Sequence, residues 1–180
     1  CILDPKSIGK TRSKNGSKIS PQVKWYARIR DSKTIPEAER EILVEKIKKN
    51  VLAYGVGIVS ETEIDKLNIH HASLLAMRRA VSKIISKTPR LKELFVLIDG
   101  KFKIPDLQVP QQAIINGDAL SLSIAVASII AKTHRDAIMR ELDKKFPKYG
   151  FAKHKGYGTR EHLRAIRKFG ASKVHRKSFI

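Results

Sequence analysis

Two aspartates, Asp99 and Asp118, each follow an apolar run at a point where a carboxylate could do chemistry. The first run, 94–98, is short, continuous and rich in β-branched and aromatic residues. This pattern is typical of a strand buried on both faces in a sheet covered by helices. Asp99 would then lie at the carboxyl end of the strand, where open α/β sheets bind ligands. The alternative is an Asp-Gly turn with no chemical role, and the pattern alone does not separate the two.

Asp118 closes a second short apolar run, 113–115, through the sequence Asn116-Gly117-Asp118. The residues from 119 to 132 are almost all apolar or small, which predicts a long buried helix beginning here. A carboxylate at or next to the N-cap of that helix would satisfy unpaired N–H groups, so a structural role is the alternative. We expect the two aspartates at the ends of neighbouring strands.

The charge of the chain favours a polyanionic partner. There are 37 Lys and Arg against 17 Asp and Glu, a formal net charge of +20. The excess is concentrated towards the two ends, because segments 9–33 and 144–180 each contain a single acidic residue, Asp31 and Glu161. The alternative is a solubilising surface or a general preference for lysine, and the concentration of charge at the two ends weakens it. Nucleic acid is the expected partner.

Two carboxylates in a strongly basic protein predict a divalent metal ion beside a phosphodiester. Hard cations such as Mg²⁺ take oxygen ligands and often bind through one or two carboxylates plus substrate phosphate. Two such ions about 3.5–4 Å apart can activate a water and stabilise the leaving oxygen. The sequence contains no zinc-ligand, GxSxG, Walker A or dinucleotide-binding pattern. These features favour a metal-dependent nuclease over a non-catalytic nucleic-acid-binding domain.

The elements around these aspartates are predicted to form one α/β domain. The length of 180 residues and a hydrophobic content of 42% suit a single core. Thr34 and Glu37 form a capping-box pattern, which predicts a helix that ends at Gly55, with one buried stripe (Ile42, Leu43, Ile47, Val51 and Leu52) and a strand after it at 56–59.

A second capping-box pattern at Ser60 predicts a helix that Pro89 stops. Before these elements, a basic loop over 6–26 carries Trp25 and Tyr26, which could stack on bases or anchor the loop to the core.

The C-terminal segment 144–180 is predicted to be a basic substrate-binding region. Glycine, aromatic and basic residues are mixed over 149–159, and Thr159 can cap a basic helix over 160–169. Such a mixture suits contact with a sugar-phosphate backbone. The single cysteine, the lack of a signal-peptide pattern and the lack of a long apolar run predict a cytoplasmic protein without a membrane span.

The motifs of the chain resemble those of bacterial ribonuclease HII, the type 2 ribonuclease H family, in the family's order and over essentially the whole chain. The matching stretches are Asp31-Ser32-Lys33, Glu63-Ile64-Asp65 with Asn68-Ile69, Leu97-Ile98-Asp99-Gly100, Gly117-Asp118 with 127–132, 149–152 running into 154–159, and 175–179. The resemblance implies a ribonuclease H-like fold, a mixed sheet flanked by helices with a helical C-terminal part. It implies an endonuclease that cuts the RNA strand of RNA–DNA hybrids, and single ribonucleotides embedded in DNA, by a two-metal-ion mechanism with Mg²⁺ or Mn²⁺. A monomer acting in DNA replication and repair is expected.

The resemblance also assigns roles to individual residues. Asp99 and Asp118 would be two of four metal-binding carboxylates, and Tyr157 would pack on the sugar at the RNA-to-DNA junction. The residues expected to meet substrate phosphates are Lys33, Lys155 and Arg176. Asp136 could be an accessory carboxylate near the site by this comparison, but a surface ion pair with Arg135 or Arg140 is the favoured role.

The chain departs from the family pattern at its beginning. The family opens with a strand carrying Asp-Glu-Ala-Gly-Arg-Gly, which supplies the other two carboxylates, and no Asp-Glu pair occurs in this sequence. We therefore expect an N-terminally incomplete ribonuclease H-like domain over 1–180 that binds hybrids weakly and cleaves them little. The alternative is a nucleic-acid-binding protein that has lost its catalytic site. The basic loop 6–26 is also longer than the family's usual connection.

Overall fold

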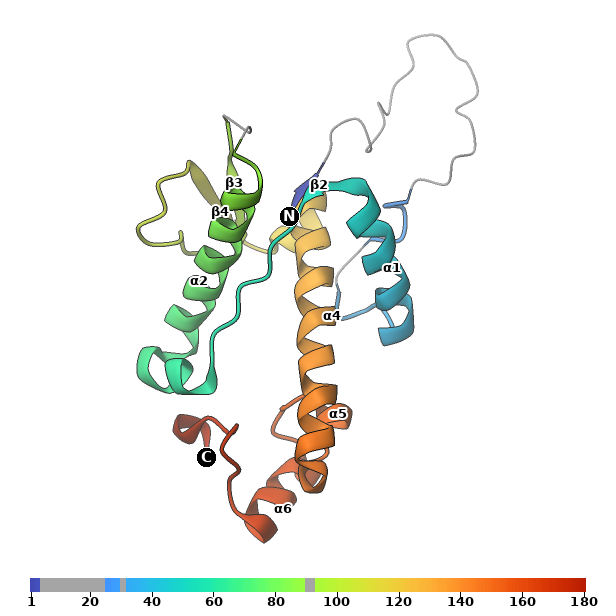
Figure 1. The fold of residues 1–180 in the computed structure, drawn as a ribbon, viewed down its shortest axis with the longest axis vertical. Coiled ribbons are helices and arrows are strands. Elements are labelled where there is room, and N and C mark those ends of the chain that lie inside the picture. The colour runs from blue at the N-terminus through green and yellow to red at the C-terminus, as the bar shows by residue number, and fades with distance from the viewer. Residues whose placement is uncertain (4–24, 30–31, 90–92) are drawn as a thin grey trace. The chain divides into compact units, whose positions relative to one another are not determined.

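The computed structural model describes residues 1–3, 25–29, 32–89 and 93–180 (Figure 1). The elements follow in the order β1 (Ile2–Leu3), α1 (Glu37–Asn50), β2 (Val51–Ala53), α2 (Glu61–Lys87), β3 (Val96–Asp99), β4 (Gln111–Ile114), α3 (Gly117–Leu120), α4 (Leu122–Lys145), η1 (Pro147–Tyr149), α5 (Phe151–His154), α6 (Arg160–Phe169) and η2 (Lys177–Phe179). The chain forms two compact units: Cys1–Ile58 with Leu74–Ile130, and Val59–Ser73 with Ala131–Ile180. Among the described residues, no helix is long and apolar enough to cross a membrane.

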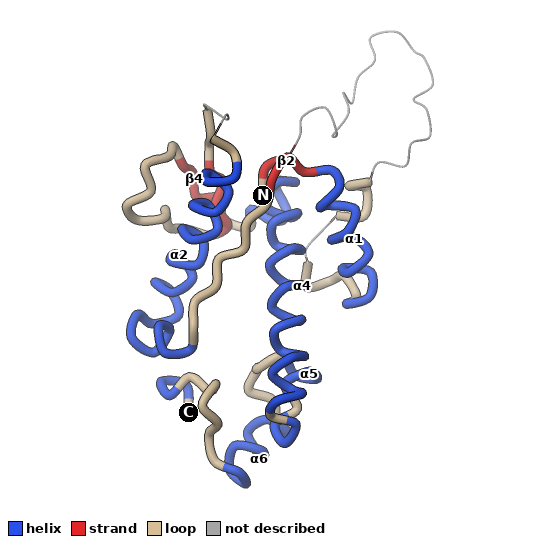
Figure 2. The backbone as a smooth tube through the Cα atoms, in the orientation of Figure 1, coloured by secondary structure: helices blue, strands red, loops and turns tan. Residues whose placement is uncertain are grey.

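The strands of the first unit, drawn red in Figure 2, form two pairs. β1 pairs antiparallel with β2, whereas β3 pairs parallel with β4 and places Asp99 opposite Ile114. This combination of helices with parallel and antiparallel strands confirms the predicted α/β class. The prediction that the strand before Asp99 is buried on both faces is wrong. Only Ile98 of β3 is buried, and the preceding Phe95 is 60% exposed, because the described elements do not cover both faces of the strand.

The core of the first unit joins α1 to α4. Its buried members are Ile35, Leu43, Val44, Ile47, Val126, Ile129 and Ile130. Spacings of three and four residues place these side chains on one face of each helix. Trp25 packs against this cluster, which supports the anchoring alternative for the aromatic pair. Residues 6–24 of the basic loop lie outside the described part of the chain, and so do Arg30 and Asp31.

The bounds of α1 differ from those predicted at both ends. The helix begins at Glu37 with Pro36 as its N-cap in an extended conformation, so the prediction that Thr34 is the N-cap is wrong. The helix ends at Asn50, since Val51 and Leu52 leave it to pair with β1 as strand β2. Ile42 and Leu52 of the predicted stripe are 60% and 51% exposed. Residues 56–59 form no strand.

The second capping box is confirmed. The Glu63 amide donates to Ser60 Oγ at 3.3 Å, and the Ser60 amide donates to Glu63 Oε2 at 3.0 Å. The helix ends at Lys87, shortly before Pro89 as predicted, but it is interrupted at Asn68 (φ 65°, ψ 165°). The Asn68 side-chain oxygen accepts hydrogen bonds from the amides of His70 and His71, so it caps the helical turns that follow.

The segment between β2 and α2 passes against α2 at two glycines, Gly55 and Gly57. A Cβ atom on Gly57 would collide with the backbone of Ala76, and one on Gly55 would collide with the Ala80 carbonyl. The Lys83 ammonium donates to the Val56 carbonyl at 2.9 Å and holds the segment there. Glycine is needed here for space, because the backbone of α2 leaves no room for a side chain.

Candidate functional site

Asp99 and Asp118 lie on adjacent segments at one edge of the β3–β4 pair. The Gly117 amide donates to Asp99 Oδ1 at 2.9 Å, and the Gly100 amide donates to the Ile114 carbonyl at the same distance. Asp118 follows Gly117 directly, in the first turn of α3. The prediction that both carboxylates lie at the ends of neighbouring strands is confirmed, since parallel strands end at the same edge of a sheet.

The capping alternative for Asp118 is wrong. Asn116 is the N-cap of α3, in a left-handed conformation (φ 54°), and Asp118 is the second helical residue. The long helix α4 begins only at Leu122, because Ser121 is extended and separates it from α3. Asp118 therefore precedes the start of the long helix and does not cap it. It is half-buried, and Asp99 is exposed.

The two carboxylates suit a metal ion that takes most of its ligands from water and substrate and only one or two from the protein. Among residues 1–3, 25–29, 32–89 and 93–180, no group of three or more His, Cys, Asp or Glu side chains is placed to hold a metal ion. Mg²⁺ commonly binds through one or two carboxylates and fills its remaining positions with water and phosphate oxygens. Asp99 and Asp118 fit that mode of binding.

Asp136 is buried and not on the surface. It is 1% exposed, and one of its carboxylate oxygens accepts a hydrogen bond from Lys132 at 2.7 Å, one turn earlier on α4. The expected surface position is wrong because α4 continues with its buried face through this residue. The charged neighbours Arg135 and Arg140 favour a surface position in the sequence, but local charge does not report burial.

Replacing Asp136 with alanine is expected to destabilise the protein by about 3 kcal/mol, since a buried ion pair loses one partner. The free energy of unfolding in urea measures this. Glu141→Ala is the matched control, because Glu141 forms a similar pair with Lys144 on the same helix but its side chain is 63% exposed. The control should change stability by less than about 1 kcal/mol. Equal effects of the two substitutions would contradict the structural role of Asp136.

The second unit holds Tyr157 in an ordered turn after α5. Tyr157 is 60% exposed, and its amide donates to the His154 carbonyl at 2.9 Å. Lys155 is in the left-handed region (φ 52°) and Gly156 follows in the same region (φ 78°), which turns the chain sharply. Lys155 is 9% exposed and forms the C-terminal cap of α5, and its contact with substrate phosphate stays a prediction.

Three buried histidines, His154, His162 and His175, lie together beside this turn. The rings of His154 and His162 stack at 4.1 Å between centroids, and the Nε2 atoms of His162 and His175 are 3.0 Å apart. His162 Nδ1 lies 2.9 Å from the Tyr157 carbonyl, which requires a proton on Nδ1. His175 Nδ1 accepts from the Ser172 amide at 3.0 Å, so its Nε2 carries the proton donated to His162. This pattern needs both His162 and His175 to be neutral.

The pKa values of these histidines agree with that pattern. Burial lowers the pKa of His162 below its usual range, and the nearby His154 adds to this effect. Burial lowers the pKa of His175 as well, and His162 lowers it further. Sequence reasoning missed the cluster, because the separations between these histidines match neither a helix face nor a metal-ligand spacing.

The C-terminal segment around Arg176 is anchored by Asp65. The amides of Lys177 and Ser178 donate to the Asp65 carboxylate at 2.8 and 3.0 Å, and the Ser178 hydroxyl donates at 2.6 Å. These bonds, those from Ser178 first, lower the pKa of Asp65. The Arg176 guanidinium stacks on Phe179, with 3.9 Å to the ring centroid. Asp65 thus fixes the segment that presents Arg176.

Lys33 is exposed on an anchored segment of the first unit. Its neighbour Ser32 is 3% exposed and lies 2.7 Å from Ser128, hydroxyl to hydroxyl. Arg40 Nη1 donates to the Ser32 carbonyl at 3.2 Å and also to the Ile35 carbonyl. The described segment beside Lys33 is therefore held to α1 and α4.

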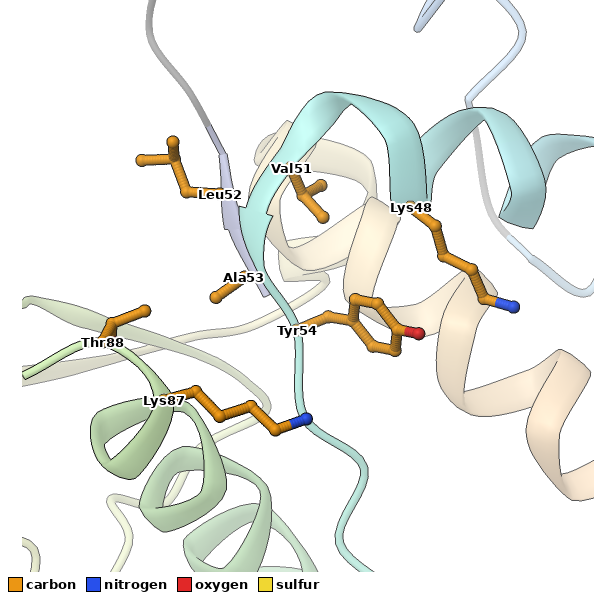
Figure 3. Close-up of a pocket in the computed structure, with 7 residues that line it drawn as sticks. All are labelled: Lys48, Val51, Leu52, Ala53, Tyr54, Lys87 and Thr88. Carbon is orange, nitrogen blue, oxygen red and sulfur yellow. The ribbon is translucent and has the colours of Figure 1, made fainter.

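A pocket of about 240 Å³ in the first unit lies between the end of α1, β2 and the end of α2 (Figure 3). It is lined by Lys48, Val51, Leu52, Ala53, Tyr54, Lys87 and Thr88. The lining contains no carboxylate, histidine or cysteine, so it offers neither a metal ligand nor a general base at neutral pH. The chemistry of the chain is expected at Asp99 and Asp118 instead.

Comparison with known proteins settles the family. The family model described as ribonuclease HII matches residues 22–180. The chain belongs to the ribonuclease HII family. A curated ribonuclease HII from Desulfitobacterium hafniense is 52% identical over 151 residues, and one from Caldanaerobacter subterraneus is 45% identical over 162 residues. The alignments cover 84% and 90% of this chain but 56% and 65% of those relatives. The chain thus spans between about half and two thirds of these relatives.

Solved structures support the fold independently. The ribonuclease H2 of Pyrococcus horikoshii matches 84% of this chain and 76% of its own with a TM-score of 0.62 and 21% identity. The ribonuclease HII in a complex with PCNA from Archaeoglobus fulgidus matches 84% and 77% with a TM-score of 0.57 and 24% identity. At these identities the likeness concerns the fold alone, and it confirms the predicted ribonuclease H-like fold.

The family match begins within the basic loop, so most of segment 6–26 precedes it.

Proposed function

We propose that the chain carries the catalytic aspartates of a ribonuclease HII, an endonuclease for the RNA strand of RNA–DNA hybrids and for single ribonucleotides in duplex DNA. The observation that carries this proposal is the placement of Asp99 and Asp118 at one edge of the β3–β4 pair, in a chain of this family. The net charge of +20 supplies attraction for a phosphate backbone.

Asp99 and Asp118 would hold Mg²⁺ or Mn²⁺ beside the scissile phosphate. The hydrogen bond from the Gly117 amide to Asp99 Oδ1 fixes the carboxylate and joins it to the segment that bears Asp118. A bound pair of ions would activate a water and stabilise the leaving oxygen. Tyr157 would pack on the sugar of the ribonucleotide junction, while Lys33 and Arg176 would meet phosphates. Lys155 would contribute to substrate binding through the turn that it forms before Tyr157.

The metal role of the aspartates can be tested by the effect of Mg²⁺ on hybrid binding and cleavage. Without metal, Asp99 and Asp118 repel the phosphates, so Asp99→Asn and Asp118→Asn should bind a labelled hybrid at least as tightly as the parent chain. With Mg²⁺, the parent chain should gain about tenfold in affinity, because the ion joins carboxylate and phosphate, and the variants should gain almost nothing. Any cleavage by the parent chain should fall by about a hundredfold or more in either variant.

Asp106→Asn is the matched control for these variants. Asp106 is an aspartate in the loop between β3 and β4, its side chain is 78% exposed, and it pairs with Arg78 at 3.4 Å. Its replacement should leave the response to Mg²⁺ unchanged. An equal response to Mg²⁺ in Asp99→Asn and the parent chain would contradict the proposal.

A second candidate function is hybrid binding with little cleavage. The observation in its favour is that, among the described residues, no third metal-binding side chain lies with Asp99 and Asp118. The same assay separates the two: salt-dependent binding with no Mg²⁺-dependent cleavage by the 180-residue chain would support the binding function. Rapid Mg²⁺-dependent cleavage would rule it out.

A further inference from the structure

Arg135, in the C-terminal half of α4, lies against the turn that presents Tyr157. Its guanidinium carbon is 5.0 Å from the centroid of the Tyr157 ring, within the range of a cation–π contact. Its Nη2 atom donates to the Lys155 carbonyl at 2.6 Å. Arg135 therefore contacts the turn at its ring and at its backbone. All of these residues belong to the second unit.

The backbone of Tyr157 is held independently of Arg135. Its amide donates to the His154 carbonyl, and its carbonyl accepts from His162 Nδ1 at 2.9 Å and from the Thr159 amide at 2.8 Å. These bonds fix the position of the Tyr157 Cα atom, but they leave the ring free to rotate about its side-chain bonds. The contact with Arg135 is the described interaction that restrains the ring itself.

Arg135 is placed to support the ring and not to bind phosphate. Its Nη1 atom is buried and has no hydrogen-bond partner among the described residues. Nη2 is committed to the Lys155 carbonyl, and one region of the guanidinium is covered by the ring. A phosphate contact of the bidentate kind needs two free N–H groups, whereas Nη1 is buried and Nη2 already donates to Lys155.

We propose that Arg135 is a positioning residue for Tyr157, one that holds the ring in the orientation in which its exposed face can pack on the sugar of a ribonucleotide junction. The inference rests on the proposed function, in which Tyr157 meets that sugar. Arg135 thereby contributes to the preference for a ribonucleotide junction over plain DNA. Its contribution to general affinity for duplexes is small.

The test compares binding of the full 180-residue chain to two labelled duplexes, one with a single ribonucleotide and one of the same sequence in DNA alone. Arg135→Lys keeps the charge but loses the planar group that stacks on the ring. It should lower the preference for the ribonucleotide duplex about fivefold, the equivalent of a typical cation–π contact, and leave binding to the DNA duplex unchanged. Combined with Tyr157→Ala, it should add nothing to the loss caused by Tyr157→Ala alone.

Two further measurements complete the test. Arg78→Lys, on an arginine that is exposed in the first unit, is the control and should leave the preference unchanged. In the free protein, Arg135→Lys should shift and broaden the Tyr157 ring resonances in an NMR spectrum, since the ring loses its restraint. Arg135→Gln keeps a donor for the Lys155 carbonyl and replaces Arg135→Lys if that variant does not fold, with the same expectations.

The other possible outcomes contradict either the positioning role of Arg135 or the proposed role of Tyr157. Equal loss of affinity for both duplexes would make Arg135 a phosphate contact and overturn the inference. Additive losses in the double variant, or unchanged Tyr157 resonances, would overturn it too. An unchanged preference in Tyr157→Ala, with shifted ring resonances in Arg135→Lys, would refute the substrate role of Tyr157 in the proposed function and leave the contact between Arg135 and Tyr157 standing.

Discussion

Replacing Gly57 with alanine is expected to destabilise the protein by about 3 kcal/mol, near the upper end for overpacking. A Cβ atom at this position would overlap the backbone carbonyl group of Ala76 in α2. A helix backbone cannot move aside as the end of a flexible side chain can, so the segment 54–58 would have to leave α2. The hydrogen bonds that Arg79 and Lys83 donate to the carbonyls of Ile58 and Val56 would weaken with it. Urea unfolding, followed by circular dichroism, measures the loss.

Gly158→Ala is the control for this substitution. A Cβ atom there would meet nothing within 4 Å, and Gly158 is not among the glycines with positive φ. Its replacement should change the free energy of unfolding by no more than about 0.5 kcal/mol. A Gly57→Ala protein as stable as Gly158→Ala would show that the segment does not pack on α2 as described.

Acidification is expected to destabilise the second unit through its buried histidines. Burial lowers the pKa of both His162 and His175, so the unfolded chain, with an ordinary histidine pKa of about 6.5, binds more protons than the folded chain. The stability that the neutral pair contributes is therefore fully present above about pH 6.5. It is lost as the pH falls through the lowered pKa values of the folded state. Thermal unfolding at pH 7.5, 6.5 and 5.5 should show a midpoint that falls by several degrees.

Substitutions of histidine separate this effect from general acid denaturation. His175→Gln should lower stability at pH 7.5, because His162 Nε2 loses its donor, and should flatten the dependence between pH 7.5 and 5.5. His134→Gln is the control, since His134 is exposed on α4, and it should keep the pH profile of the parent chain. A parent chain equally stable at all three pH values would contradict the neutral hydrogen-bond pattern.

The sequence was sufficient for the features that depend on local chemistry. The Ser60–Glu63 capping box, the Thr159 cap of α6 and the strand that ends at Asp99 all follow from residues within a few positions of one another. The family followed from motifs in a fixed order, and the family model confirms it over residues 22–180. The metal, the substrate, the monomeric state and the single domain over 1–180 with its basic region at 144–180 remain predictions.

Features that depend on partners distant in sequence were decided by the tertiary structure. Val51 and Leu52 continue the helical pattern of α1, but pairing with β1 makes them a strand, since backbone pairing outweighs a small difference in helix propensity. Asp136 has charged neighbours in sequence and is nevertheless buried, because burial depends on what packs against α4.

The same reason explains the two groups in the second unit that sequence reasoning missed. His154, His162 and His175 become a cluster only when α5, α6 and the C-terminal segment fold together. Arg135 meets Tyr157 across a separation of 22 residues, through a turn whose left-handed residues bring the ring back to α4. The sequence by itself determined the family and the position of Asp99 and Asp118 at the ends of neighbouring strands. The tertiary structure decided which side chains support Tyr157, because that depends on contacts that no local pattern encodes.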